Sequence, residues 1–230
     1  HITEYKQIDY TRPKNIDPSD AGVNVQAIDL MDFYENSEIE GTGWTLLPEQ
    51  RTFIQSVNTE TYEKLISRNE IEAYVQRMTL KSTNGDDDCI GCILCYMQTE
   101  SGEIYELDLL IQFGGINIGT GTFGSGTGPT MALVFNYQKA NQKVLKQVVL
   151  KDGVTESVPW NSVNGVSLYI NKGPLGIRIW HKYNNDNAWL TGYPGAGDDP
   201  TIEYQFSEED NTDVFSTQAS RYGFGTHSQA

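Results

Sequence analysis

The chain has 230 residues, with 31 acidic against 16 basic residues and a formal net charge of −15. Such a surface repels phosphate, which argues against nucleic acid or an anionic membrane as a partner. No apolar run approaches the roughly 20 residues that a membrane-spanning helix needs, so membrane insertion is not expected. The length suits one large domain, and cations, neutral sugars and other proteins remain as classes of partner.

The first forty residues differ in composition from the rest of the chain. They are polar, acidic and rich in Pro and Asp, with one apolar patch around residues 28–34. This composition predicts a linker or attachment segment over residues 1–40 with at most a short helix, followed by one domain over residues 41–230. The segment would attach that domain to a larger polypeptide or assembly.

Short alternating runs follow in chain order. The clearest covers residues 103–113, where apolar residues recur at every second position, the period of a strand with at least one buried face. Similar runs predict strands over residues 71–80, 131–137, 144–150, 166–170, 175–180, 201–206 and 222–228. Residues 58–75 also fit a helical stripe. With 22 glycines and no long helix, the chain is predicted to be all-β, an antiparallel sandwich or barrel.

Three cysteines, Cys89, Cys92 and Cys95, lie within seven residues. Their spacing superficially suggests an iron–sulfur or zinc site. On a strand, however, residues three apart point to opposite faces, so Cys92 is expected to face away from the other two. No fourth cysteine completes a metal site, and the cysteines are interpreted as buried free thiols that pack as small apolar residues.

A dinucleotide-binding site and a hydrolytic triad are both unsupported by the residues around their candidate motifs. Residues 119–124 match the dinucleotide pattern GxGxxG, but the following Gly- and Pro-containing sequence cannot open a helix, so a loop between strands is expected. His181 and His227 lie far apart in sequence, and no nucleophile elbow accompanies them. A hydrolytic triad is therefore not expected.

Glu106 and Asp108 share one face of the strand predicted over residues 103–113. Two carboxylates about 5 Å apart can act as acid and nucleophile in glycoside hydrolysis. Jelly-roll glucanases resembling laminarinase add a third carboxylate two or three residues later, where this chain has Leu110 and Ile111. We therefore expect a solvated strand face, with a glycoside hydrolase on a jelly-roll scaffold as the alternative.

A polar loop carries Trp189 and Tyr193, with Asp198 and Asp199 shortly after them. A pyranose presents an apolar face to aromatic rings and hydroxyl groups to amides and carboxylates, so these four residues are candidate ligand-binding residues. Such rings can equally close the end of a sandwich. Trp180, upstream of the loop, is expected in the core.

Asp86, Asp87 and Asp88 follow Asn84 and Gly85 in a compact acidic loop. Calcium takes six to eight hard oxygen ligands, which carboxylates and backbone carbonyls supply, and the glycine permits a tight turn. A solvated turn explains the same residues equally well.

Two stretches of the chain resemble the concanavalin A-like sandwiches of the thrombospondin C-terminal type. Residues 80–96 place the Asp-Asp-Asp turn before an Ile-Gly strand, and residues 221–229 form a closing Gly-aromatic segment that ends in Ser-Gln. The resemblance spans about residues 44–230 and implies an antiparallel jelly-roll sandwich of the L-type lectin kind. It departs at Cys92 and Cys95, where the family usually has Phe or Val.

Domains of this family occur in extracellular adhesins, bacterial surface proteins and phage tail or fibre proteins, and many bind calcium at one edge of the sandwich. The resemblance therefore implies a calcium-assisted recognition module, not an enzyme, for a surface glycan or peptide. Its place would be extracellular, on a cell or virion surface. Asp86, Asp87 and Asp88 would hold the calcium. A purely structural fibre or virion component is a further alternative.

Overall fold

The computed structural model describes most of the region predicted to be β-structure. The described residues are 3–5, 26–28, 30–50, 52–56, 62–81, 89–112, 116–117, 122–123, 130–139, 142–152, 165–183, 194–195, 197–207, 215 and 219–227.

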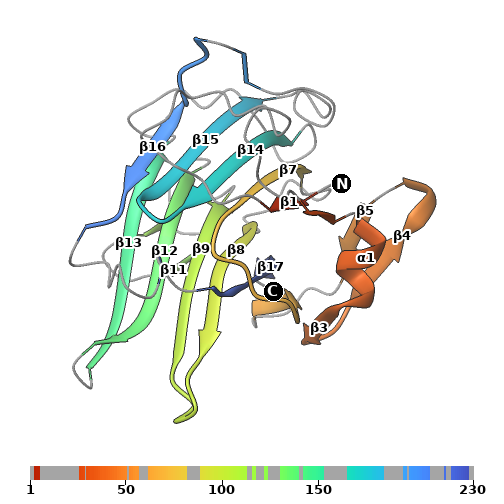
Figure 1. The fold of residues 1–230 in the computed structure, drawn as a ribbon, viewed down its shortest axis with the longest axis horizontal. Helices are drawn as coiled ribbons and strands as arrows, with labels where there is room; N and C mark the ends of the chain where they lie inside the picture. Colours follow the sequence, from red (N-terminus) through yellow and green to blue (C-terminus); the bar gives the residue numbers. More distant parts are fainter. Residues whose placement is uncertain are drawn as a thin grey trace.

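Two antiparallel sheets form the body of the protein (Figure 1). The front sheet has seven strands in the order β13-β12-β9-β8-β17-β6-β3. These strands are β3 (Ser37–Glu40), β6 (Tyr62–Ser67), β8 (Cys89–Gln98), β9 (Ile104–Gln112), β12 (Thr130–Lys139), β13 (Gln142–Asp152) and β17 (Arg221–His227).

The back sheet has six strands in the order β16-β15-β14-β7-β1-β2. These strands are β1 (Thr3–Tyr5), β2 (Gln26–Ile28), β7 (Tyr74–Leu80), β14 (Val166–Gly173), β15 (Gly176–Tyr183) and β16 (Ile202–Gln205). Smaller elements are α1 (Leu30–Glu35), the 3-10 turn η2 (Pro48–Gln50), the pair β4 (Trp44–Leu47) and β5 (Thr52–Gln55), and the pair β10 (Ile116–Asn117) and β11 (Thr122–Phe123).

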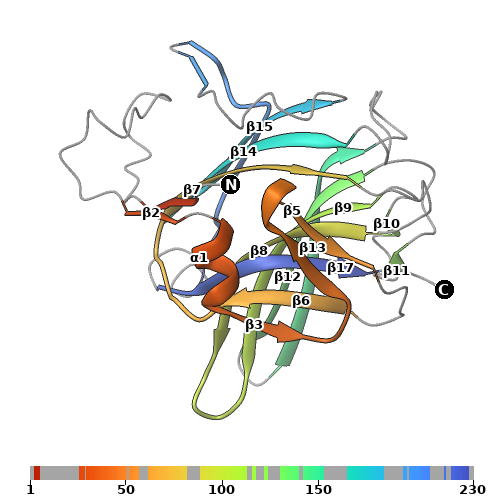
Figure 2. The same ribbon diagram turned by 90° about the vertical axis from the view of Figure 1, so that its right-hand side faces the viewer.

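The hydrophobic core lies between the two sheets, which form separate layers in Figure 2. Alternate residues of each strand point into it because successive side chains on a strand point to opposite faces. The front sheet supplies Leu107, Leu109, Leu133 and Phe135, and the back sheet supplies Leu168, Ile170, Ile177 and Ile179. The protein is thus an antiparallel jelly-roll β-sandwich, which confirms the predicted fold class.

The strands predicted from alternation are all present, with ends shifted by a few residues. The helical alternative for residues 58–75 is wrong where the structure describes that segment, because residues 62–67 form β6 and residues 74–75 begin β7. Leu65 points into the core while Tyr62 and Lys64 point away, so tertiary packing selects the two-residue period of a strand.

The expectation that Cys92 faces away from Cys95 is also wrong. Both side chains lie in the same core cluster and are fully buried. The pairing of β8 with β9 shifts between Ile93 and Cys95, and such a β-bulge adds one residue and returns Cys95 to the face of Cys92. The interpretation of these two residues as buried free thiols is confirmed, while the side chain of Cys89 lies outside the described residues.

Part of the N-terminal segment packs on the sandwich. Phe33 in α1 is buried, and its ring centroid lies 5.7 Å from that of Phe53 and 5.6 and 5.4 Å from those of Tyr222 and Phe224. β3 extends the front sheet beside β6. The division of the chain at residue 40 stays a prediction, but α1 and β3 contribute to the core and sheet that the later residues build.

Among the described residues, no helix has the length and apolar character needed to cross a membrane.

Candidate functional site

The face of the front sheet turned away from the core, which we call the outer face, carries an unusual set of polar side chains. On β9, Leu107 and Leu109 point into the core, so Glu106, Asp108 and Leu110 point to the outer face. Glu106 is 4% exposed and Asp108 is 6% exposed. The expectation of a solvated strand face is therefore wrong, because both carboxyl groups are buried.

Lys64 on β6 reaches Glu106 across the intervening strands β17 and β8. Its Nζ lies 2.7 Å from Glu106 Oε2, and the exposed fractions of the two side chains are 14% and 5%. Gly225 on β17, the residue paired with Lys64, has no side chain in the way. A Cβ at Gly225 would lie 2.3 Å from the Tyr62 hydroxyl oxygen, so a larger residue there would displace the Tyr62 ring.

Two tyrosine rings flank the Lys64 ammonium group. Lys64 Nζ lies 5.2 Å from the ring centroid of Tyr62 and 5.4 Å from that of Tyr96 on β8. Both distances fit cation–π contacts, in which the negative face of a ring attracts a cation. The ammonium group is thus held between a carboxylate and two aromatic rings.

Asp108 has a perturbed acidity. Burial raises the pKa of its carboxyl group well above the ordinary value of 3.8, and the charge of neighbouring Glu106 adds to the increase, while the charge of Lys64 lowers it. A hydrogen bond with Glu106 raises the pKa of Asp108 further, and one with Tyr62 lowers it. The net increase favours the protonated form of Asp108, while Lys64 lies against Glu106.

Several buried oxygens on this face have no hydrogen-bond partner among the described residues. They are Glu106 Oε1, Asp108 Oδ1 and Gln147 Oε1. Gln147 on β13 pairs with Val134 on β12, which pairs with Asp108, so Gln147 lies on the same face two strands away from the carboxyl pair. Leaving a buried acceptor unpaired costs about 1–3 kcal/mol. Hydrogen-bond donors from water or from a ligand would satisfy these atoms.

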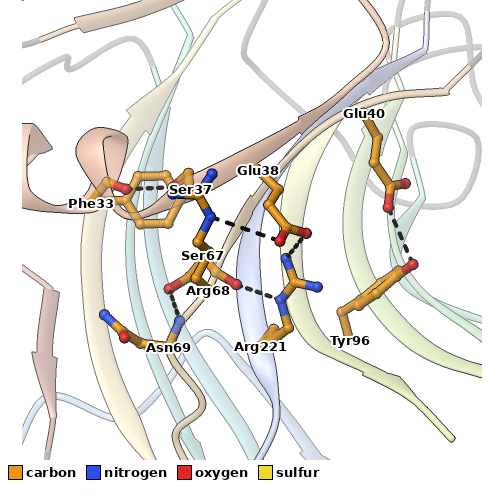
Figure 3. A network of polar contacts seen from close by, with 9 residues as sticks. All are labelled: Phe33, Ser37, Glu38, Glu40, Ser67, Arg68, Asn69, Tyr96 and Arg221. Atoms are coloured by element: carbon orange, nitrogen blue, oxygen red, sulfur yellow. Dashed lines mark hydrogen bonds and ion pairs between the residues drawn. The ribbon is translucent and has the colours of Figure 1, made fainter. Parts of the chain in front are cut away.

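The rim of the outer face next to β3 is closed by an ionic network (Figure 3). Arg221 Nη2 donates a hydrogen bond of 2.6 Å to Glu38 Oε2, and its Nε donates one of 2.6 Å to the carbonyl oxygen of Ser67. Arg68 Nε lies 3.7 Å from Glu38 Oε1. The Glu38 carboxylate thus faces both guanidinium groups, and Arg221 is fixed beside the site.

Tyr96 connects this rim to the carboxyl pair. Its hydroxyl donates a 3.3 Å hydrogen bond to Glu40 Oε1, and the Arg221 guanidinium carbon lies 5.6 Å from its ring centroid. Burial and the nearby charges of Glu40 and Glu106 raise the pKa of Tyr96 to about 12, so the hydroxyl stays a donor at neutral pH.

The arrangement offers acceptors, a carboxyl group with a raised pKa and an aromatic ring on one face of a sandwich. A retaining glycosidase needs an acid and a nucleophile about 5 Å apart. Burial and the charge of Glu106 raise the pKa of Asp108, which favours the acid role for that residue. The position of a third carboxylate is occupied by Leu110, which is buried beside Val134.

Most of the ligand and calcium residues predicted from the sequence lie outside the described residues. These are Asp86, Asp87, Asp88, Trp189 and Tyr193. Within the described parts of the chain, no group of three or more His, Cys, Asp or Glu side chains is arranged to hold a metal ion. The predicted calcium site therefore stays a prediction.

The structure describes Asp198 and Asp199, which are exposed and far in sequence from the outer-face residues of β9. The Asp198 carboxylate accepts a 2.5 Å hydrogen bond from the backbone nitrogen of Gly195. The backbone carbonyl oxygen of Asp198 accepts a hydrogen bond of 3.1 Å from Trp180 Nε1. Trp180 is buried as expected, but on the back sheet it packs against Tyr169, on the opposite face to the core residue Ile179. Asp198 thus orders its own turn, and its predicted ligand role stays untested.

The buried thiols offer no reactive site. Burial raises the pKa of Cys92 and of Cys95, so both stay protonated thiols. Nearby Asp108 adds to the increase at Cys92.

Sequence reasoning found Glu106 and Asp108 but missed Tyr62, Lys64 and Tyr96. The two-residue alternation of β9 puts the carboxylates on one face, which is visible in the sequence. Lys64 lies in the segment with an alternative helical pattern, and its partner Glu106 is 42 positions away. No local pattern reports a contact between residues so far apart.

The chain was compared with protein families, with curated proteins and with solved structures. No protein-family model matches the chain, and no curated protein matches it. Among solved structures, the chain is similar to a β-glucanase from Bacillus licheniformis, with a TM-score of 0.38 and 12% sequence identity over 85% of this chain and 71% of that one. This degree of structural and sequence similarity supports the β-sandwich fold alone.

One prediction is corrected by this finding. The chain was predicted not to be an enzyme because its fold resembles that of binding domains. The β-glucanase is by its name an enzyme, and it is similar to this chain in fold. The inference from fold to absence of catalysis is therefore wrong, and the adhesin-type subfamily within the jelly-roll sandwiches is not established. The chain is similar in fold to a jelly-roll β-sandwich protein.

Proposed function

We propose that this protein is a glycan-directed module whose ligand binds across the outer face of the front sheet, over β9, β12 and β8. The observation that carries the proposal is the set of buried acceptor oxygens without partners on Glu106, Asp108 and Gln147. Sugar hydroxyl groups are donors that suit such acceptors, and sites for small ligands combine a few polar groups with apolar and aromatic surroundings.

The surroundings of these acceptors support the same ligand class. The partly exposed Tyr62 ring, which packs against Leu110 and Val134, offers apolar surface for a pyranose ring. Asn136 on β12 pairs with Glu106 and is partly exposed, so its amide adds a donor and an acceptor toward solvent.

A glycan array probed with the labelled protein, followed by calorimetric titration of the best glycan, tests the proposal. Binding is expected in the wild type and is expected to weaken at least about tenfold in Glu106→Gln, the loss of one charged hydrogen bond. Glu49→Gln is the matched control, because Glu49 is exposed in η2 and the substitution removes the same charge. An array without any bound glycan, with and without calcium, would contradict the proposal and leave a structural fibre or virion role.

Hydrolysis of a glycoside is a second candidate function. It is favoured by the raised pKa of Asp108, since a carboxyl group that keeps its proton can act as a general acid. Its test is the release of reducing ends from a panel of β-glucans, which should vanish in Glu106→Gln. Unchanged release in that variant would remove this candidate.

A calcium requirement is a separate part of the proposal. Asp86, Asp87 and Asp88 directly precede β8, so an ion held by them would lie at the start of that strand. We expect calcium to raise the melting temperature of the metal-free protein, and Asp87→Ala to abolish that increase. An equal melting temperature with and without calcium would remove the metal from the proposal. An adhesin or phage receptor-binding role at a cell or virion surface, with a glycan or a peptide as ligand, stays a prediction.

A further inference from the structure

The buried part of the outer face is one positive charge short. Among its described side chains, Glu106 and Asp108 are carboxyl groups and Lys64 is the one cation in contact with them. The rim does not supply the missing cation, because the Arg221 and Arg68 guanidinium groups are directed to Glu38. Glu40, the other rim carboxylate, accepts from Tyr96.

The shortage bears on what the site can accept. A buried carboxylate without a partner is unfavourable, so the group either keeps a proton or gains a cation. Burial and Glu106 raise the pKa of Asp108, which favours its protonated form. A ligand with its own positive charge would remove the need for that proton.

The rings beside the site suit a cation as well as a sugar. Tyr62 and Tyr96 already lie within cation–π distance of one ammonium group, that of Lys64. The net charge of −15 would also draw cations toward the protein over a longer range.

We infer that the outer-face site prefers an amino sugar, a pyranose with a primary ammonium group, over its neutral counterparts. The ammonium group donates to Asp108 Oδ1 and Glu106 Oε1, the oxygens that lack partners. Any proton that Asp108 holds in the free protein passes to solvent when the ammonium group binds, so two carboxylates then face the ammonium groups of Lys64 and of the ligand. This inference rests on the proposed function, because it specifies the ligand of the same site.

The test is calorimetric titration of the whole chain with matched β-1,4-linked tetrasaccharides of glucosamine, N-acetylglucosamine and glucose at about pH 5, where the sugar amine is charged. We expect the glucosamine tetramer to bind at least about tenfold more tightly than the N-acetylated one, the effect of one charge-assisted hydrogen bond. Repeating the titration in buffers of different ionisation enthalpy should reveal proton release for glucosamine alone.

Asp108→Asn provides the variant arm. It keeps an oxygen acceptor but has neither a charge nor a proton to release, so the preference for glucosamine and the buffer dependence should both disappear, while neutral sugars still bind. Glu49→Gln, which removes an exposed charge far in sequence from the site, should leave both effects unchanged. The comparison of the three tetrasaccharides on the wild type needs no variant, so it decides the question even if Asp108→Asn does not fold.

The possible outcomes separate the two claims. Equal affinity for the three tetrasaccharides would overturn the amino-sugar inference and leave the proposed function standing. Failure of every sugar to bind would overturn the proposed function itself. Tri-lysine, which has ammonium groups without pyranose rings, completes the test: binding as tight as that of glucosamine would overturn the assignment to a sugar.

Discussion

The inner and outer faces of β9 are equally buried but chemically opposite. Leu107, Leu109 and Ile111 on the inner face are 0% exposed and belong to the core cluster between the sheets. Glu106 and Asp108 alternate with them on the outer face and are 4% and 6% exposed. One face is complete with its apolar contacts, whereas the other retains oxygens without partners.

This difference teaches that burial alone does not separate a core from a site. Burial of an apolar side chain stabilises the fold, whereas burial of an incompletely paired carboxyl group opposes it. Proteins retain such groups at functional sites more often than elsewhere. The following experiments test whether the two faces differ in energy as they differ in chemistry.

The largest effect should separate two adjacent leucines. Leu109 is fully buried in the core cluster, and Leu110 is 2% exposed in a small outer-face cluster with Val134 and Tyr62. Leu109→Ala should lower the free energy of unfolding by about 3–5 kcal/mol, and Leu110→Ala by about 2 kcal/mol, because the smaller cluster can relax around the cavity. Urea denaturation measures both, and equal losses would show that the outer face is packed like a core.

A smaller loss should follow from removing the cation of the outer face. Lys64→Met leaves Glu106 buried without its partner, and we expect a loss of up to about 3 kcal/mol at neutral pH. The double variant Lys64→Met, Glu106→Gln should recover most of it, because the uncompensated charge is gone. Denaturant titration of the full double-mutant cycle checks this, and additive losses would contradict a direct pair.

The pH dependence of stability should report Asp108. Because its pKa is raised in the fold, folding binds a proton in the pH range between 3.8 and the raised value, so the free energy of unfolding falls as pH increases through that range. Each unit of increase in the pKa contributes about 1.4 kcal/mol to that fall. Asp108→Asn lacks this contribution and should gain stability relative to the wild type as pH rises from about 4 to about 7.

Chemical denaturation at a series of pH values measures that difference. Glu49→Gln serves as the control, since it removes an exposed carboxylate in η2, far in sequence from β9. Parallel profiles for Asp108→Asn and the wild type would show that Asp108 ionises normally.

The smallest effect is expected at the rim. The Glu38 side chain is 48% exposed, so solvent screens its ion pair with Arg221, which also keeps its hydrogen bond to Ser67. Glu38→Gln should change the free energy of unfolding by at most about 0.5 kcal/mol. Thermal unfolding in low and high salt measures it, and a loss comparable to that of Lys64→Met would place Glu38 inside the site.

The sequence by itself determined the strands and therefore the fold class. Alternation along residues 103–113 places Leu109 and Asp108 on opposite faces, because the backbone of any strand imposes a two-residue period. The same alternation predicted that Glu106 and Asp108 share a face. These are local properties, and a local pattern is enough to predict them.

Only the tertiary structure decided what those faces contact. The bulge in β8 turned Cys95 to the side of Cys92, and the pairing of β6 with β17 brought Lys64 within reach of Glu106. Burial of the carboxyl pair, and hence the raised pKa of Asp108, follows from side chains on other strands. Contacts between residues distant in sequence depend on sheet order and register, which no single stretch of the chain encodes.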